Sequence, residues 1–190
     1  MEVTVLTPPY DGRSQAKLGR AVRSVAEQTV AARHVVRWDH DRKGPGPMCN
    51  LLLDEVDTPW VCRLDDDDWL HPHHIETLLA HADGNTVVYS SCEVVGANLP
   101  AINRAFDRDD LEVENFIPCT ALVATDAIRA VGGWPETYAE DYGLWLLLAR
   151  SGHRFEWVPD VTWVYDLTGT KHRSMRRPAN AGAHARRVTR

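Results

Sequence analysis

The sequence lacks any apolar run close to the roughly 20 residues that a membrane-spanning helix needs, so no transmembrane segment is predicted. Its first residues carry neither a basic region nor a small-residue cleavage site, and we therefore expect no signal peptide. Repeats and low-complexity blocks are also missing. With 190 residues, of which 44% are hydrophobic and 25% charged, the composition predicts one globular domain.

Cysteine is scarce and shows no paired spacing. The four cysteines follow one another at intervals of 13, 30 and 27 residues, each within an apolar stretch: Cys49, Cys62, Cys92 and Cys119. This spacing excludes a recognisable zinc knuckle and argues against a disulfide framework, so we expect free buried thiols and a cytoplasmic protein. There are nine histidines, but no HExxH pattern accompanies them, which favours surface histidines over a zinc site.

Acidic residues are missing from the end of the chain. Residues 171–190 hold seven Lys or Arg and no Asp or Glu, whereas the first 170 residues carry a balance of -13 within a total net charge of -6. A basic tail on an acidic body can bind an anionic partner such as nucleic acid, a lipid phosphate or a nucleotide. The alternative is a disordered, solubilising terminus, which we favour beyond Pro178.

Short apolar segments alternate with amphipathic helical patterns in the first half. This alternation predicts an α/β fold with a mostly parallel central sheet and helices on both faces. The expected strands are 3–7, 34–38 and 60–64, and the expected helices are 15–29, 48–56 and 72–82. A smaller mixed half follows, with strands at 86–90, 93–97, 121–123, 155–158 and 162–165, helices at 125–131 and 140–150, and an irregular acidic segment at 99–118.

Four consecutive aspartates, 65–68, directly follow the expected strand 60–64. Adjacent carboxylates repel one another, and open α/β sheets bind ligands at the carboxyl ends of their strands. A divalent cation would neutralise the cluster, because Mg²⁺ and Mn²⁺ prefer oxygen ligands. A solvated acidic turn is the alternative, but the buried strand before the run and the helix after it favour the cation.

Two further acids, Glu140 and Asp141, open the apolar helix 140–150. The positive end of a helix dipole favours carboxylates, so both could simply stabilise the helix start. A carboxylate at this position that faces a cleft could instead be a general base. The residues by themselves leave both interpretations open.

Three ordered segments resemble the family 2 glycosyltransferases of the GT-A fold. The opening 5–10 followed by 18–29 is similar to the family's first strand and helix, and 64–72 resembles its DxD segment. Gly132-Gly133-Trp134, followed by Glu140-Asp141, resembles the family's GGF and ED segment. The similarity covers about residues 3–166. The sequence departs from the family at two points: the usual DDGS element reads Asp-His-Asp-Arg at 39–42, and the gap from Asp39 to Asp65 is short.

The resemblance implies roles for single residues. It implies that Asp67 binds the metal directly, with Asp65 near it and His172 completing the metal shell, and that Asp141 is the catalytic base. The nucleotide-binding residues that it implies are Thr7, Pro8, Tyr10, Asp39, Asn50 and Asp66. Trp134 and Glu140 would lie on the acceptor side, with helix capping or acceptor binding left for Glu140.

As a whole, the resemblance implies a small stand-alone, inverting hexosyltransferase that uses Mn²⁺ or Mg²⁺. We expect a single GT-A, Rossmann-like domain over 1–170 and a basic tail over 171–190, with Lys171, His172 and Arg173 folding over the donor as a lid. The implied donor is a UDP- or GDP-type sugar. The acceptor stays open between a glycan, a lipid phosphate and a modified nucleic acid, and the oligomeric state stays open as well.

Two other functions compete with this one. A nucleotidyltransferase acting on sugar phosphates also uses paired acids with Mg²⁺, but it would show a Gly-rich phosphate loop where this chain has Pro8-Pro9-Tyr10-Asp11-Gly12. A non-catalytic subunit that binds a sugar nucleotide is the second alternative, and the presence of both Asp67 and Asp141 argues against it.

Overall fold

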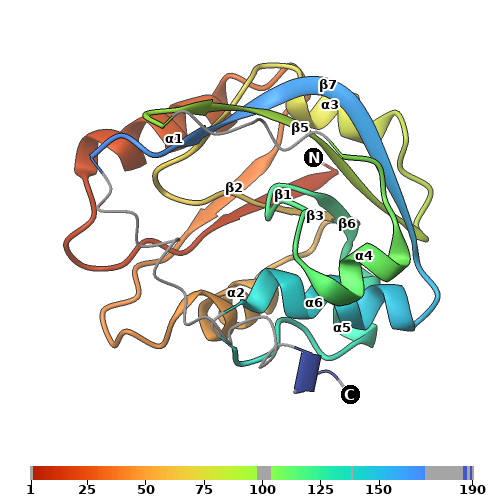
Figure 1. Ribbon diagram of the computed structural model, residues 1–190. Coiled ribbons are helices and arrows are strands. Elements are labelled where there is room, and N and C mark those ends of the chain that lie inside the picture. Colours follow the sequence, from red (N-terminus) through yellow and green to blue (C-terminus); the bar gives the residue numbers. More distant parts are fainter. Residues whose placement is uncertain (1, 98–103, 138, 170–185, 188, 190) are drawn as a thin grey trace.

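The computed structural model describes residues 2–97, 104–137, 139–169, 186–187 and 189, and it contains one seven-stranded sheet with helices on both sides (Figure 1). The strands are β1 (Val3–Thr7), β2 (Arg33–Val36), β3 (Trp60–Arg63), β4 (Trp69–Leu70), β5 (Thr86–Val95), β6 (Leu122–Ala124) and β7 (Arg154–Asp166). The helices are α1 (Gln15–Ala26), α2 (Pro45–Leu53), α3 (His74–Leu79), α4 (Arg108–Val113), α5 (Thr125–Ala130) and α6 (Glu140–Arg150).

The sheet is mixed, which corrects the expectation that it is mostly parallel. Its strand order is β2-β1-β3-β6-β5-β7-β4. The pairs β1–β2, β1–β3 and β5–β7 are parallel, whereas β3–β6, β5–β6 and β4–β7 are antiparallel. The parallel βαβ pattern of the first half therefore ends at β3, because the next strand in space, β6, comes from the second half and runs the other way.

Each face of the sheet is covered by its own hydrophobic core, as the alternation of side chains along a strand requires. On β3, Val61 faces a cluster formed with α2, α4, α5 and α6. Its neighbour Cys62 faces the opposite cluster, formed with α1 and α3. Figure 1 shows the same division, with α1 and α3 on one side and α2, α5 and α6 on the other. The expectation of helices on both faces is confirmed.

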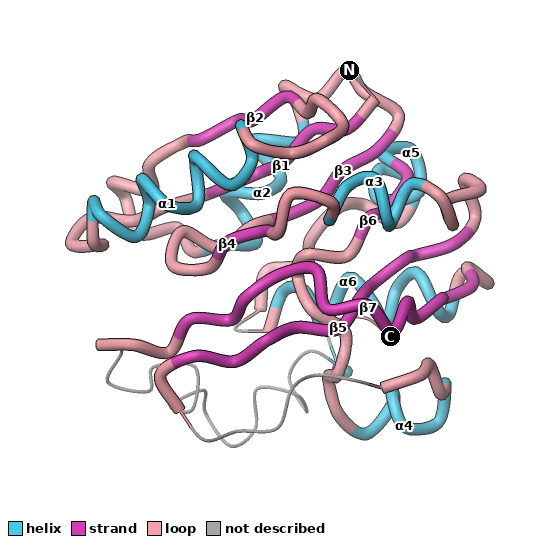
Figure 2. Tube along the Cα trace, turned by 90° about the horizontal axis from the view of Figure 1, so that it is seen from above, coloured by secondary structure: helices cyan, strands magenta, loops and turns pink. Residues whose placement is uncertain are grey.

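The second half contains fewer but longer strands than the sequence predicts. The expected strands 86–90 and 93–97 form the single strand β5, and 155–158 and 162–165 form β7 (Figure 2). In their parallel pairing, Ser90 lies opposite Val158, and the next residue, Ser91, lies opposite Val161. A bulge thus interrupts the register where the sequence suggested a break between strands. The acidic segment 99–118, expected to be irregular, contains α4.

The path from β3 to β4 positions the candidate site. β3 lies in the middle of the sheet, but β4, only six residues further along, pairs with β7 at the sheet edge. The chain between them, 64–68, therefore crosses the end of the sheet, and this segment contains the four aspartates. The carboxyl end of β3 and the edge pair β4–β7 meet at this crossing.

The sequence predicted no disulfide framework and no transmembrane segment. All four cysteines are free thiols, as expected, and Cys49, Cys62 and Cys92 are buried. Among the residues that the structure describes, no helix has the length and apolar character required to cross a membrane.

Candidate functional site

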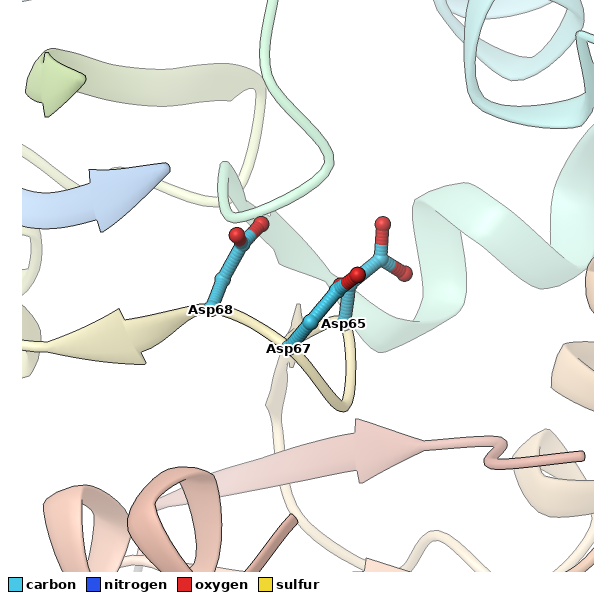
Figure 3. A group of neighbouring side chains, drawn as sticks. All are labelled: Asp65, Asp67 and Asp68. Carbon is cyan, nitrogen blue, oxygen red and sulfur yellow. The ribbon is translucent and has the colours of Figure 1, made fainter. Parts of the chain in front are cut away.

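The turn between β3 and β4 carries three carboxylates that can share one cation. Asp65, Asp67 and Asp68 each offer an oxygen, and these oxygens lie within 4.8 Å of one another. Figure 3 shows the three side chains projecting from the turn toward the same side. Clustered carboxylate oxygens suit Mg²⁺ or Mn²⁺, so the donor set fits the cation that the sequence predicts. Asp65 and Asp67 were expected in this cluster, and the structure adds Asp68.

The surroundings of the cluster disfavour the charged forms of Asp67 and Asp68. Burial raises the pKa of Asp67, the charge of Asp65 raises it further, and Arg13 partly offsets both. Burial raises the pKa of Asp68 well above its usual range, and Asp65 adds to this effect. Asp68 Oδ1 accepts a hydrogen bond of 2.8 Å from the backbone N–H of Asp166 at the end of β7, which offsets part of the shift. A bound cation would favour the charged form of each carboxylate.

Arg13, in the turn between β1 and α1, pairs with the two middle aspartates. Its Nε lies 2.7 Å from each carboxylate oxygen of Asp66, and its Nη2 also contacts Asp66. The same Nη2 lies 2.5 Å from Asp67 Oδ2. Burial would lower the pKa of Arg13, but the two carboxylates more than offset this and raise it. Asp66, expected to bind the nucleotide, thus binds an arginine here.

Arg63, the last residue of β3, joins the Asp-rich turn to the start of α6. Its Nη2 donates to Asp65 Oδ1 at 2.5 Å and its Nη1 to Glu140 Oε1 at 2.6 Å. The side chains of Arg63 and Glu140 are only 6% and 3% exposed. Burial alone would lower the pKa of Arg63, yet the charges of Asp65 and Glu140 hold it well above its usual range. Glu140, expected on the acceptor side, is therefore a buried partner of this arginine.

Asp141 lies next to Glu140 but has different contacts. Its Oδ1 accepts a 2.8 Å hydrogen bond from the N–H of Tyr142, and its Oδ2 lies 3.5 Å from Asn115 Nδ2. Burial raises the pKa of the Cys119 thiol well above its usual range, with Asp65 and Asp141 adding to the shift. Because Arg63 binds both Asp65 and Glu140, the residue before Asp141, it brings the Asp-rich turn close to the start of α6.

The end of β1 is more enclosed than a nucleobase pocket requires. Thr7 is buried, and its Oγ1 lies 2.9 Å from His34 Nε2 on the neighbouring strand β2. Burial lowers the pKa of His34 to about 4, so this ring is neutral at pH 7. Pro8 is partly exposed and Tyr10 follows two residues later. Of these expected pocket residues, Pro8 and Tyr10 keep accessible surface.

Asp39 and Tyr10 lie side by side, as their expected shared role requires. The two residues form an isolated parallel bridge beyond the ends of β1 and β2. The carboxylate of Asp39 is buried and accepts hydrogen bonds of 2.8 Å from the backbone N–H groups of Lys43 and Gly44. These bonds hold the loop before α2 against the strand ends.

Asn50 and Trp134 are bound to each other. Asn50 Nδ2 donates to the carbonyl oxygen of Trp134, and the Trp134 N–H donates to Asn50 Oδ1, each at 2.8 Å. Gly133 has a φ of +83°, and a Cβ there would lie 2.3 Å from Asn50 Oδ1, so this position accepts glycine only. The amide of Asn50 thereby ties α2 to the segment that leads into α6, and Trp134 is buried.

His172, together with the rest of the expected lid at Lys171 and Arg173, lies outside the described residues. Part of the expected disordered end is described and contacts the body. Arg186 Nη1 donates to the Val113 carbonyl at 2.9 Å. Thr189 is 6% exposed and accepts hydrogen bonds from Arg150 Nη1 through its carbonyl and hydroxyl oxygens.

Sequence reasoning missed Arg13, Arg63, Asp68, Asn115 and Cys119. Arg63 offered a usable signal, because a charged residue inside an otherwise apolar strand must find a buried partner. Asp68 stood in the motif itself. Nothing adjacent in the sequence marks the other three, which reach the site only through the packing of the chain.

Comparison with known proteins agrees with this geometry. The sequence model described as Glycosyl transferase family 2 matches residues 10–121, which is more than half of the chain. No curated protein sequence matches the chain.

Among solved structures, residues 1–349 of TarS from S. aureus in complex with UDP-GlcNAc align over 92% of this chain, with a TM-score of 0.75 and 18% identity. The mannosyltransferase PcManGT from Pyrobaculum calidifontis, in complex with GDP-Man and Mn²⁺, aligns over 90% with a TM-score of 0.66 and 16% identity. The alignments cover 61% and 58% of those two chains, so this chain spans about three-fifths of their length. At such identities the likeness establishes the GT-A fold.

Proposed function

The chain belongs to glycosyl transferase family 2, and from this we propose that it is an inverting glycosyltransferase that moves a hexose from a nucleoside diphosphate to an acceptor hydroxyl. One observation carries the proposal. A carboxylate cluster suited to a divalent cation is joined through Arg63 to the start of α6, where a separate carboxylate, Asp141, lies. Such a transfer needs both parts, one for the leaving diphosphate and one for the acceptor proton.

The leaving-group side belongs to the Asp-rich turn. Asp65, Asp67 and Asp68 would hold Mn²⁺ or Mg²⁺, and such an ion, when bound, would neutralise the charge that develops on the departing diphosphate. Arg63 fixes the orientation of Asp65 from the buried side. The chain supplies these carboxylates already gathered in one turn.

The acceptor side belongs to Asp141. Its carboxylate would accept the proton of the acceptor hydroxyl while that oxygen attacks the anomeric carbon and the bond to the diphosphate oxygen breaks. Attack from the face opposite the leaving group inverts the anomeric centre. The packing of Asn50 against the Gly133-Trp134 segment and the Arg63–Glu140 pair both hold the start of α6, and with it Asp141, in place.

For the donor, we propose a UDP- or GDP-sugar. TarS was solved with UDP-GlcNAc and PcManGT with GDP-Man, and this chain shares their fold. Tyr10, beside Asp39, would line the nucleobase pocket, with Pro8 at its edge. We propose a glycan, a lipid phosphate or a modified nucleic acid as acceptor, and the free thiols support a reducing, cytoplasmic setting.

A thermal-shift panel tests this proposal. UDP-, GDP- and dTDP-sugars are added to the protein with and without Mn²⁺, because a ligand that binds the native state raises the Tm by mass action. We expect one nucleotide class to stabilise the parent, and to do so much more when Mn²⁺ is present. Asp67→Ala should lose the Mn²⁺-dependent part, whereas Asp126→Ala, at a fully exposed position on α5, should keep it. No Mn²⁺ effect in the parent would refute the metal dependence.

A further inference from the structure

Arg13 places a positive charge beside Asp67, one of the carboxylates that a divalent cation would also bind. Its guanidinium lies between Asp66 and Asp67, with Nε 2.7 Å from both oxygens of Asp66 and Nη2 2.5 Å from Asp67 Oδ2. Asp67 is also a member of the three-carboxylate cluster. One carboxylate is therefore shared between an internal arginine and the proposed metal site.

The two positive groups compete for Asp67. A divalent ion and a guanidinium that share one carboxylate repel each other, so each binds that carboxylate less strongly than it would alone. The arginine already supplies part of the neutralisation, since its Nη2 lies 2.5 Å from Asp67 Oδ2. Binding of an ion must therefore weaken or break the contact between Arg13 and Asp67.

Two features keep Arg13 near the site after that contact is lost. Its guanidinium carbon lies 5.0 Å from the centre of the Tyr10 ring, and its Nη1 lies 3.3 Å from the Tyr10 hydroxyl. The side chain is 20% exposed and comes from a turn, next to Gly12 with a φ of +89°. By contrast Arg63 is 6% exposed and binds the buried Glu140 as well as Asp65, so it has no comparable freedom.

We propose that Arg13 couples cation binding to donor binding. It neutralises Asp66 and Asp67 when the cluster holds no ion, and an ion at the cluster displaces it from Asp67, so that the guanidinium, still beside Asp66, can donate to the donor diphosphate. Diphosphate oxygens share the ion with the carboxylates, and an arginine fork suits them. The inference rests on the proposed function. It also makes a prediction that an arginine acting only in donor binding would not make: removing Arg13 should tighten the binding of the ion alone.

The test uses Mn²⁺ alone, followed by Mn²⁺ with UDP or GDP. Free Mn²⁺ is measured by electron paramagnetic resonance during titration of the parent and of Arg13→Gln. We expect Arg13→Gln to bind Mn²⁺ about tenfold more tightly, within the usual range of coupling between sites. Saturating nucleotide should tighten Mn²⁺ binding in the parent by a larger factor than in Arg13→Gln.

Lys17→Gln is the matched control. It removes the same charge from the same region of the chain, but Lys17 contacts Asp166, at 3.2 Å, and the Thr168 carbonyl. If Lys17→Gln tightens Mn²⁺ binding as much as Arg13→Gln does, the effect is general electrostatics and the inference is wrong.

Three further outcomes would also overturn it. Equal or weaker Mn²⁺ binding by Arg13→Gln would reject the competition while leaving the proposed function intact. Absence of Mn²⁺ binding in parent and variant alike would reject this inference together with the metal dependence of the proposed function. A nucleotide effect of equal size in both proteins would reject the coupling.

Discussion

The carboxylates of the site fall into two groups that are neutralised in different ways. At the start of α6, Glu140 is buried and held by Arg63, which is buried as well. In the Asp-rich turn, Asp66 and Asp67 are held by Arg13, whose side chain keeps 20% of its surface exposed. The first arginine is fixed by packing on all sides, and the second sits in a turn at the protein surface.

The difference in exposure between Arg63 and Arg13 indicates which ion pair can be broken and replaced during binding. A buried pair that loses one partner leaves an uncompensated charge away from water, so the Arg63–Glu140 pair must persist through any reaction. A partly exposed pair loses much less, because water replaces the missing partner. Asp65 contacts Arg63 and also belongs to the cation cluster, so it joins the fixed group to the exchangeable one.

The largest expected effect separates the two carboxylates that open α6. Asp141→Asn should lower the rate of the chemical step by about 10²–10⁴-fold, the usual contribution of a general base. Glu140→Gln should change this step far less, because Glu140 is the buried ion-pair partner of Arg63. Single-turnover kinetics with saturating donor, once an acceptor is known, measure both. A near-normal step in Asp141→Asn, together with a large loss in Glu140→Gln, would reverse the roles.

The next effect concerns stability and tests the comparison directly. Arg63→Met should lower the free energy of unfolding by about 3–5 kcal/mol, because Glu140 is left buried and unpaired. Arg13→Gln should lower it by less than Arg63→Met does, because Arg13 keeps 20% of its side chain exposed and the glutamine amide can still donate to Asp66. Urea denaturation measures both variants.

Adding Glu140→Leu to Arg63→Met should recover part of the lost stability, since an apolar pair needs no counter-charge. Similar losses in Arg63→Met and Arg13→Gln would show that burial does not distinguish the two arginines.

The last expected effect concerns a buried group held by uncharged partners. His74 is fully buried, with Nδ1 2.7 Å from Thr162 Oγ1, and Nε2 3.1 Å from the Thr120 carbonyl and 3.8 Å from Cys62 Sγ. Burial lowers its pKa from 6.5 to about 4, the charge of His71 adding to the shift. Below pH 6.5 the unfolded chain therefore takes up a proton that the folded chain refuses.

Stability from His74 is complete above pH 6.5 and is lost as the pH falls toward 4, by up to about 3 kcal/mol. The difference between the pH–stability curves of the parent and His74→Asn isolates this contribution, since His34 and the carboxylates titrate in both. Curves that run parallel between pH 4 and 7 would contradict the prediction.

Local pattern was a good guide where neighbours in the sequence decide the structure. The helix 140–150 was predicted with its observed bounds, because an apolar run with acids at its start specifies both its type and its beginning. The strand at 3–7 was also predicted with its observed bounds, because its residues are β-branched or apolar. The bulge that joins two expected strands into β7 was not predictable, because it depends on the register with β5.

The sequence by itself determined the chemistry available at this site: a run of four aspartates after an apolar strand and a pair of acids at a helix start. Only the tertiary structure decided how each charge is used. Arg13 meets Asp66 across 53 residues, Arg63 meets Glu140 across 77, and Asn50 meets Trp134 across 84. Side-chain periodicity reports which face a residue lies on but not which distant element packs there, so these contacts appear only when the chain folds.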